Sequence, residues 1–96
     1  MTKPFADLTV IELATVLAGP SVGMFFAELG ARVIKIESPE FGGDVTRSWQ
    51  LPGETGNVSA YFSAVNYQKT YLSLNLKNKE SRADLNRLLA EADILL

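Results

Sequence analysis

The pattern of apolar and polar residues along this chain predicts four short strands. Leu8–Leu13 and Arg32–Glu37 are mostly apolar and rich in β-branched residues, which is typical of strands buried in a sheet. Thr70–Leu76 alternates polar and apolar residues, the period of a strand, and Asp93–Leu96 begins a fourth strand.

Helical periodicity fills the intervals between these strands. From Pro20 to Leu29 the apolar residues recur at the spacing of one helix face, namely Val22, Phe25, Phe26 and Leu29. Pro20 suits a first helical turn and Gly30 a left-handed helix end, and the apolar composition predicts a helix covered on most sides. A second long helix is predicted to begin after Asn78, which suits its N-cap. The buried stripe of this helix is predicted to be Leu85, Leu88, Leu89 and Ala92. Ser59–Val65 fits a short helix.

A strand, a tight turn, a helix and a second strand within about 30 residues form a βαβ unit, whose strands are parallel. The fold class is therefore predicted to be α/β with a parallel sheet. Ser38–Asn57 is a long irregular stretch, and such loops usually serve a function. The chain ends on Ile94–Leu96 as a buried strand begins, so it is predicted to be a truncated fragment of a larger protein. A small complete domain with this strand at a sheet edge is the alternative.

Composition narrows the classes of function. The 96 residues are 47% hydrophobic and 21% charged, as in a globular domain, and the net charge of −2 argues against nucleic acid or an anionic membrane as a partner. Cysteine and histidine are absent, which removes thiolate, zinc-finger and Ser–His–Asp chemistry. The longest apolar runs are far below the roughly 20 residues of a membrane helix. A soluble, cytoplasmic protein is the expectation.

The turn between the first strand and the first helix is the first candidate site. A helix that opens directly from a parallel strand presents free N–H groups and a positive dipole end, which suit a phosphate. Glu37 lies where a ribose-binding acid of a dinucleotide site would lie, but Gly19-x-x-x-Gly23 does not match the Gly-x-Gly-x-x-Gly fingerprint. The alternative is a structural use of both glycines, for the turn and for helix packing.

Two further segments are candidates. In the long loop, Asp44 and Arg47 have the spacing of a local ion pair or a turn, and Trp49 could anchor the loop to the core as readily as contact a ligand. Lys77 follows the third strand, where its charge could meet a phosphate or simply be solvated. The acids Asp84, Glu91 and Asp93 fit the solvated face of the second long helix, and no residues form a metal cluster.

Taken together, the motifs resemble the start of the class III CoA-transferases, the family of formyl-CoA transferase, carnitine CoA-transferase and α-methylacyl-CoA racemase. The resemblance runs from about Phe5 to the last residue. Its motifs are Leu13-x-x-Val16-Leu17-Ala18-Gly19-Pro20, Leu29–Glu37, Gly43-Asp44-x-x-Arg47, Asn66-x-x-Lys69-x-x-x-Ser73-Leu74-Asn75-Leu76-Lys77 and Ala92–Leu96.

This resemblance implies a Rossmann-like, CoA-binding domain, of which residues 1–96 are the N-terminal part, a smaller second domain and an interlocked homodimer. The positions implied to contact the CoA nucleotide are Val16, Leu17, Ala18, Ser38, Leu74 and Lys77. Formyl-CoA transferases carry an arginine in place of Ser38. The nucleophilic aspartate of the family lies beyond residue 96, so no catalytic residue and no metal ligand is assigned here.

The leading interpretation is the CoA-binding portion of a CoA-transferase that moves CoA between an acyl-CoA and a carboxylic acid. The 96-residue chain by itself is predicted to be inactive. One alternative is an α-methylacyl-CoA racemase of the same fold, which would use a paired acid and base. Another is a non-catalytic α/β module that binds a nucleotide or a protein partner.

Overall fold

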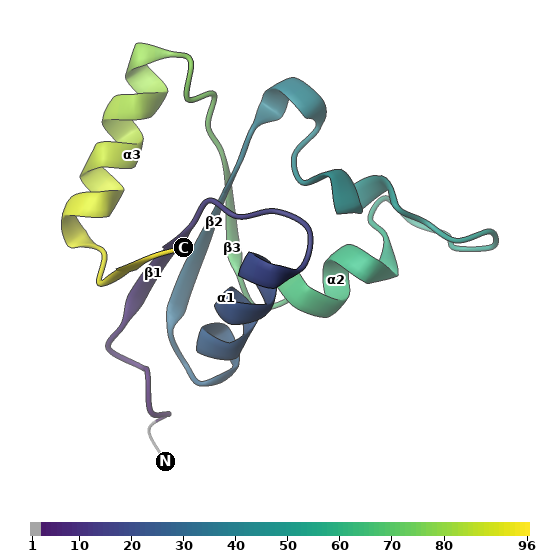
Figure 1. The fold of residues 1–96 in the computed structure, drawn as a ribbon, viewed down its shortest axis with the longest axis horizontal. Coiled ribbons are helices and arrows are strands. Elements are labelled where there is room, and N and C mark those ends of the chain that lie inside the picture. Colours follow the sequence, from purple (N-terminus) through teal and green to yellow (C-terminus); the bar gives the residue numbers. More distant parts are fainter. Residues whose placement is uncertain (1–2) are drawn as a thin grey trace.

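Strands and helices alternate along residues 3–96, the part of the chain that the computed structural model describes (Figure 1). Residues 1 and 2 of the expected 1–96 unit lie outside the described residues. The elements are β1 (Thr9–Glu12), α1 (Ala18–Glu28), β2 (Arg32–Glu37), α2 (Ala60–Asn66), β3 (Thr70–Ser73), α3 (Lys79–Glu91) and β4 (Ile94–Leu95). Each overlaps its predicted segment, although β3 ends three residues before the predicted Leu76.

All strand pairs are parallel and follow the order β3-β2-β1-β4, which confirms the predicted α/β fold with a parallel sheet. Val10 in β1 lies opposite Val33 in β2 and Ile94 in β4, and Ile34 in β2 lies opposite Thr70 in β3. The central strands β1 and β2 are almost wholly buried, as expected for parallel strands covered on both faces.

The core has one layer on each face of the sheet, because successive strand residues point to opposite faces. On the α1 side, the buried cluster is Val10, Ala27, Ala31 and Val33. On the α3 side, it is Ile11, Ile34, Ile36 and Leu85, with Leu88, Leu89 and Ala92 packed against it. The predicted stripe of the second long helix therefore faces the sheet, and Asn78 caps this helix by accepting from the N–H groups of Glu80 and Ser81.

The face of α1 that packs on the sheet differs from the predicted stripe. Its buried residues are Pro20, Gly23, Met24 and Ala27. Val22 and Phe25 are instead about half exposed, and Phe25 packs edge-to-face with Phe5. The expectation that other elements cover α1 on most sides is therefore wrong for the described residues. Because α1 is apolar on nearly every side, the helical period fits more than one face. Gly30, with a φ of 106°, ends the helix as predicted.

The long loop after β2 contains two short helical turns rather than only irregular chain. They are Pro39–Phe41, capped by the Ser38 hydroxyl, and Val45–Ser48, capped by the Asp44 carboxylate. The short helix predicted at Ser59–Val65 is α2, with Ser59 as its N-cap. No helix among the described residues is long and apolar enough to cross a membrane.

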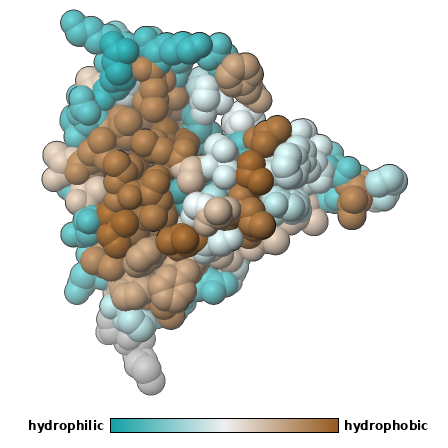
Figure 2. Space-filling view, in the orientation of Figure 1, coloured by the Kyte–Doolittle hydropathy of each residue, from teal (hydrophilic) through white to brown (hydrophobic). Residues whose placement is uncertain are grey.

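Apolar side chains remain exposed beside the sheet. Figure 2 shows them gathered between α3 and α1, on the side of the molecule that carries β4. Leu95 in β4 is 55% exposed and Leu13, just after β1, is 39% exposed. Contiguous apolar surface of this kind is typical of contact surfaces.

Candidate functional site

A cleft of about 740 Å³ opens at the carboxyl ends of β2 and β3, the edge at which ligands of open parallel sheets bind. Its walls come from the residues that follow β1, from the end of β2 with its loop, and from the residues that follow β3. They are Leu13, Thr15, Ile36, Glu37, Ser38, Glu40, Phe41, Gly43, Asp44, Val45, Leu74, Asn75, Leu76 and Lys77.

The structure brings three of the sequence-predicted site residues together and leaves three beside them. Those that line the cleft are Ser38, Leu74 and Lys77. Val16 and Leu17 lie on the neighbouring turn before α1, Ala18 is the first residue of α1, and none of the three lines the cleft. Thr15 connects this turn to the cleft wall, so the two groups are adjacent parts of one edge of the sheet.

The turn before α1 has a strained backbone. Val16 has a φ of 70°, a left-handed conformation that is unfavourable for a β-branched residue. Its N–H donates to the two carboxylate oxygens of Asp44, at 3.3 and 3.5 Å. Leu17 is the N-cap of α1, and no side chain caps this helix. Pro20 has no N–H and the Ser21 N–H donates to the Leu17 carbonyl, so the N–H groups of Ala18 and Gly19 are the ones that an anion could bind.

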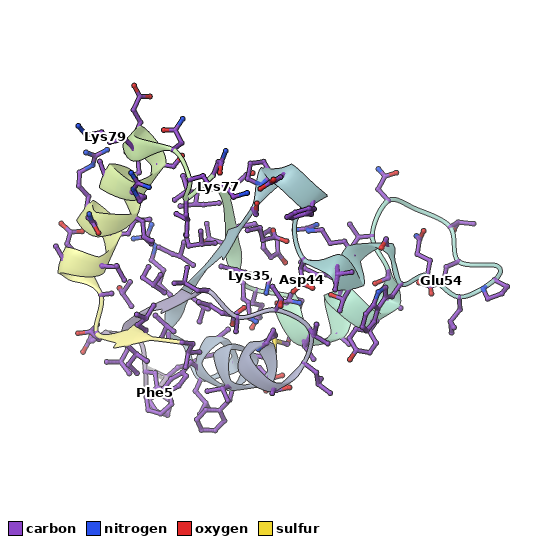
Figure 3. The ribbon with its side chains drawn as sticks, turned by 45° about the horizontal axis from the view of Figure 1, so that its top comes forward. Phe5, Lys35, Asp44, Glu54, Lys77 and Lys79 are labelled. Atoms are coloured by element: carbon purple, nitrogen blue, oxygen red, sulfur yellow. The ribbon has the colours of Figure 1, made fainter. Side chains whose placement is uncertain are left out.

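Lys35 lies at the centre of a buried ion cluster that includes the cleft-lining residue Asp44, and Figure 3 shows Lys35 and Asp44 close together. Its ammonium contacts Glu12 Oε2 at 2.9 Å, the Ala14 carbonyl at 2.9 Å and Asp44 Oδ2 at 3.0 Å, so all three of its donors have partners. Burial raises the pKa of Asp44, but hydrogen bonds from the Thr46 N–H and hydroxyl, together with Lys35, outweigh burial and hold that pKa below its ordinary value.

Lys69, just before β3, extends this cluster to α1 and α2. Its ammonium donates to Glu12 Oε1 at 2.8 Å, to the Pro20 carbonyl at 2.9 Å and to Asn66 Oδ1 at 2.8 Å. Burial lowers the pKa of Lys69, and the Glu12 carboxylate opposes that shift. Glu12 thus receives one lysine on each oxygen, and these contacts join β1 to α1 and to the chain before β3.

Arg47 and Glu37 form a second ion pair at the same edge. The guanidinium donates through Nε and Nη2 to the two oxygens of Glu37, each at 2.7 Å, and it lies 4.0 Å from the centroid of the Phe62 ring. Burial raises the pKa of Glu37, but the bonds from Arg47 and from the Asp44 N–H outweigh burial and lower that pKa. Because its oxygens are so engaged, Glu37 is not a free ribose-binding acid.

The expected local ion pair between Asp44 and Arg47 is wrong. Each residue pairs with a side chain of β2, Asp44 with Lys35 and Arg47 with Glu37. Asp44 does cap a turn, which was the other expectation for this spacing. Trp49 does not anchor the loop in the core, because it is 45% exposed and stacks edge-on against Tyr61.

Sequence reasoning missed three members of the cluster, Glu12, Lys35 and Lys69. The signal that could have found them is a charged residue at a position where the neighbouring residues are apolar and buried, as at Lys35 between Ile34 and Ile36. A charge at such a position requires a buried partner. Asp93 is exposed, as expected, but it lies beyond the end of α3 and accepts the N–H of Thr9 at 2.8 Å.

At the mouth of the cleft, Lys77 forms an exposed ion pair with Glu40. The Ser38 hydroxyl accepts the Glu40 N–H at 3.3 Å, so part of its hydrogen-bonding capacity serves the turn. Among the cleft-lining residues, all within the described part of the chain, only Lys77 has a basic side chain. Residues 3–96 contain no group of three acidic, histidine or cysteine side chains placed to hold a metal ion.

A family model described as CoA-transferase family III matches residues 5–96. The chain belongs to this family. The match confirms the resemblance drawn from the sequence motifs. Within this family III chain, the motif Gly43-Asp44-x-x-Arg47 supplies the loop side of the two ion pairs with β2, Asp44 with Lys35 and Arg47 with Glu37.

Relatives and solved structures agree with this assignment. A succinate–glutarate CoA-transferase from Agrobacterium fabrum is 44% identical, over 97% of this chain and 24% of the relative. A formyl-CoA:oxalate CoA-transferase from Escherichia coli O81 is 40% identical, over 100% of this chain and 23% of the relative. A CAIB/BAIF family protein from Brucella suis superposes with a TM-score of 0.87 at 43% identity, over 99% of this chain and 25% of that protein. The chain thus spans about a quarter of the length of these relatives.

Proposed function

We propose that this family III chain is the CoA-binding portion of a CoA-transferase and that its cleft holds the nucleotide end of CoA. The observation that carries the proposal is the convergence of Ser38, Leu74 and Lys77, from the ends of two neighbouring strands, on one cleft. The resemblance to CoA-transferases, which rests on the sequence alone, implies the same three residues as CoA contacts.

The chemistry of the cleft suits a phosphate-bearing nucleotide. Leu74, Phe41 and Ile36 offer apolar walls for a base, and Lys77 offers the charge for a phosphate. The uncapped N-terminus of α1 lies beside them, with the strained turn at Val16. Ser38 adds at most a neutral hydrogen bond, so Lys77 carries the charge recognition that an arginine at position 38 would otherwise share.

For the whole protein we propose transfer of CoA between an acyl-CoA and a carboxylic acid, within an interlocked homodimer in the cytoplasm. The relatives from Agrobacterium fabrum and Escherichia coli bear the names of transferases, which favours transfer over racemisation. The resemblance puts the carboxylate nucleophile beyond residue 96. We therefore propose that residues 1–96 alone bind CoA but do not catalyse its transfer.

The test of CoA binding is the substitution Lys77→Ala. Loss of one charge-assisted contact at an exposed lysine weakens CoA binding by about tenfold. Lys79→Ala is the matched control, because Lys79 is exposed nearby at the start of α3 and does not line the cleft. Isothermal titration calorimetry measures both affinities.

Equal CoA affinity of the Lys77→Ala and parent proteins would remove Lys77 from the site. Equal affinity of the parent protein for CoA and dephospho-CoA would show that Lys77 contacts another group than the ribose phosphate.

A further inference from the structure

The ion pair at the mouth of the cleft bridges its two walls. Lys77 Nζ lies 3.2 Å from Glu40 Oε1 and 3.1 Å from Glu40 Oε2. Lys77 follows β3, Glu40 lies in the helical turn after β2, and Figure 3 shows Lys77 beside that turn. Both residues line the cleft, and their side chains are 76% and 41% exposed. An incoming ligand therefore meets this pair directly.

Glu40 differs from the other two acids of the cleft. Glu37 is held by Arg47 at 2.7 Å and Asp44 by Lys35 at 3.0 Å, and both acids are buried. Glu40 is exposed, and within the described residues its ion-pair partner is Lys77. The negative charges of Glu37 and Asp44 are thus compensated inside the protein, whereas that of Glu40 depends on the lysine that faces the ligand.

A ligand phosphate and the Glu40 carboxylate compete for the same ammonium. Both can approach Lys77 together only if two anions lie within a few ångströms of each other, an arrangement that their mutual repulsion disfavours. Exposed ion pairs contribute little to stability, so a phosphate can displace Glu40 into solvent, where its charge is screened. Displacement nevertheless costs the free energy of the Glu40 contact.

We infer that Glu40 sets the affinity of the cleft for phosphate-bearing ligands by occupying Lys77 until the phosphate of CoA displaces it. This inference rests on the proposed CoA site. It makes Glu40 an affinity-limiting residue. A substitution that removes the charge of Glu40 but keeps its shape strengthens CoA binding, and this gain in affinity requires Lys77. A ligand without phosphates, such as pantetheine, makes no use of Lys77 and gains nothing.

The experiment is a double-mutant cycle on Glu40→Gln and Lys77→Ala in the full-length protein, with CoA affinity measured by calorimetry at an ionic strength of about 0.15 M, where the Debye length is about 8 Å. Glu40→Gln tightens CoA binding about two- to fivefold, the range of an exposed ion pair. In the Lys77→Ala background the same substitution changes CoA affinity by less than about 1.5-fold, because distant exposed charges are screened. Glu91→Gln, which removes an exposed charge at the far end of α3, is the control and leaves the affinity unchanged.

The outcomes separate this inference from the proposal on which it rests. If Lys77→Ala weakens CoA binding but Glu40→Gln does not strengthen it, the role of Glu40 is wrong and the CoA site stands. An equal gain from Glu40→Gln with and without Lys77 shows unspecific charge repulsion and overturns displacement. An equal gain for the uncharged pantetheine shows an effect that does not involve a phosphate and overturns it as well. If the parent binds no CoA, or Lys77→Ala binds it as tightly as the parent, the CoA site itself fails.

Discussion

Lys35 and Asp44 illustrate how a buried charge depends on its partners. Their side chains are fully buried and 3.0 Å apart, and Lys35 also contacts Glu12, which it shares with Lys69. When the pair of Arg47 and Glu37 is included, this region holds as many acidic as basic side chains. Among the described residues, every buried side-chain nitrogen and oxygen atom has a hydrogen-bond partner. Removal of one member of such a set leaves a charge without compensation in the interior.

Asp44→Asn should destabilise the protein by about 3 kcal/mol or more, because Asn keeps the shape of the side chain but leaves the Lys35 charge without this partner. The double variant Lys35→Met/Asp44→Asn should be more stable than Asp44→Asn alone, since it removes the orphaned charge. Urea unfolding measures the three free energies of unfolding.

The control for this prediction is Asp84→Asn, which breaks an exposed pair with Arg87 on α3 and should change stability by less than about 0.5 kcal/mol. A double variant no more stable than Asp44→Asn would contradict charge compensation as the cause. The loss would then come from the hydrogen bonds that Asp44 accepts from Val16 and Thr46.

At the scale of elements, the packing of α1 on the sheet depends on Gly23. A Cβ at this position would overlap Glu12 Oε1 and lie 3.2 Å from Lys69 Nζ. Only a residue without a side chain therefore allows α1 to approach the buried ion pair of β1. The two glycines of Gly19-x-x-x-Gly23 serve close packing in this way, since a Cβ at Gly19 would overlap Ala14.

Gly23→Ala should destabilise the protein by about 1–3 kcal/mol, because the added methyl group displaces the buried pair of Glu12 and Lys69. The direction is opposite to that in an exposed helix, where Ala in place of Gly stabilises by about 1 kcal/mol. Glu28→Ala, at an exposed position of α1, is the control and should change stability by less than about 0.5 kcal/mol. Thermal unfolding followed by circular dichroism reports both, and a stabilised Gly23→Ala protein would refute the packing argument.

At the scale of the whole molecule, the buried ion pairs make stability depend on pH. The carboxyls of Glu37 and Asp44 have folded-state pKa values below their ordinary values of 4.5 and 3.8. A group whose pKa is lower when folded binds a proton more readily in the unfolded chain. Its contribution to stability is therefore complete above its ordinary pKa and is lost as the pH falls through its folded-state pKa.

Stability should accordingly be nearly constant from neutral pH to about pH 5 and then fall steadily as the solution is acidified. The Glu37→Gln protein should show a shallower fall, because one of the protonation steps is missing. Urea unfolding across this pH series measures the slope. A parent protein whose stability rises on acidification below pH 4, or a Glu37→Gln protein with an unchanged slope, would contradict the assignment of these carboxyls.

Local patterns in the sequence determined the elements and their class of sheet. Strand and helix periods depend only on neighbouring residues, so β1 to β4, α1 and α3 fall within or beside their predicted ranges, and the N-caps Ser59 and Asn78 act as local rules require. The convergence of Ser38, Leu74 and Lys77 was also predictable in part. Residues after neighbouring parallel strands share one edge of the sheet whatever the details of packing.

Tertiary structure alone decided which face of α1 is buried and which charges pair. The apolar residues of α1 fit two faces, and the choice depends on close approach at Gly23 over Glu12. Asp44 lies closer in sequence to Arg47 than to Lys35, yet it pairs with Lys35 because β2 and the loop after it fold back on each other. Residues that are far apart in the sequence come into contact only when the sheet has formed. The ion cluster therefore belongs to the fold rather than to any segment of the sequence.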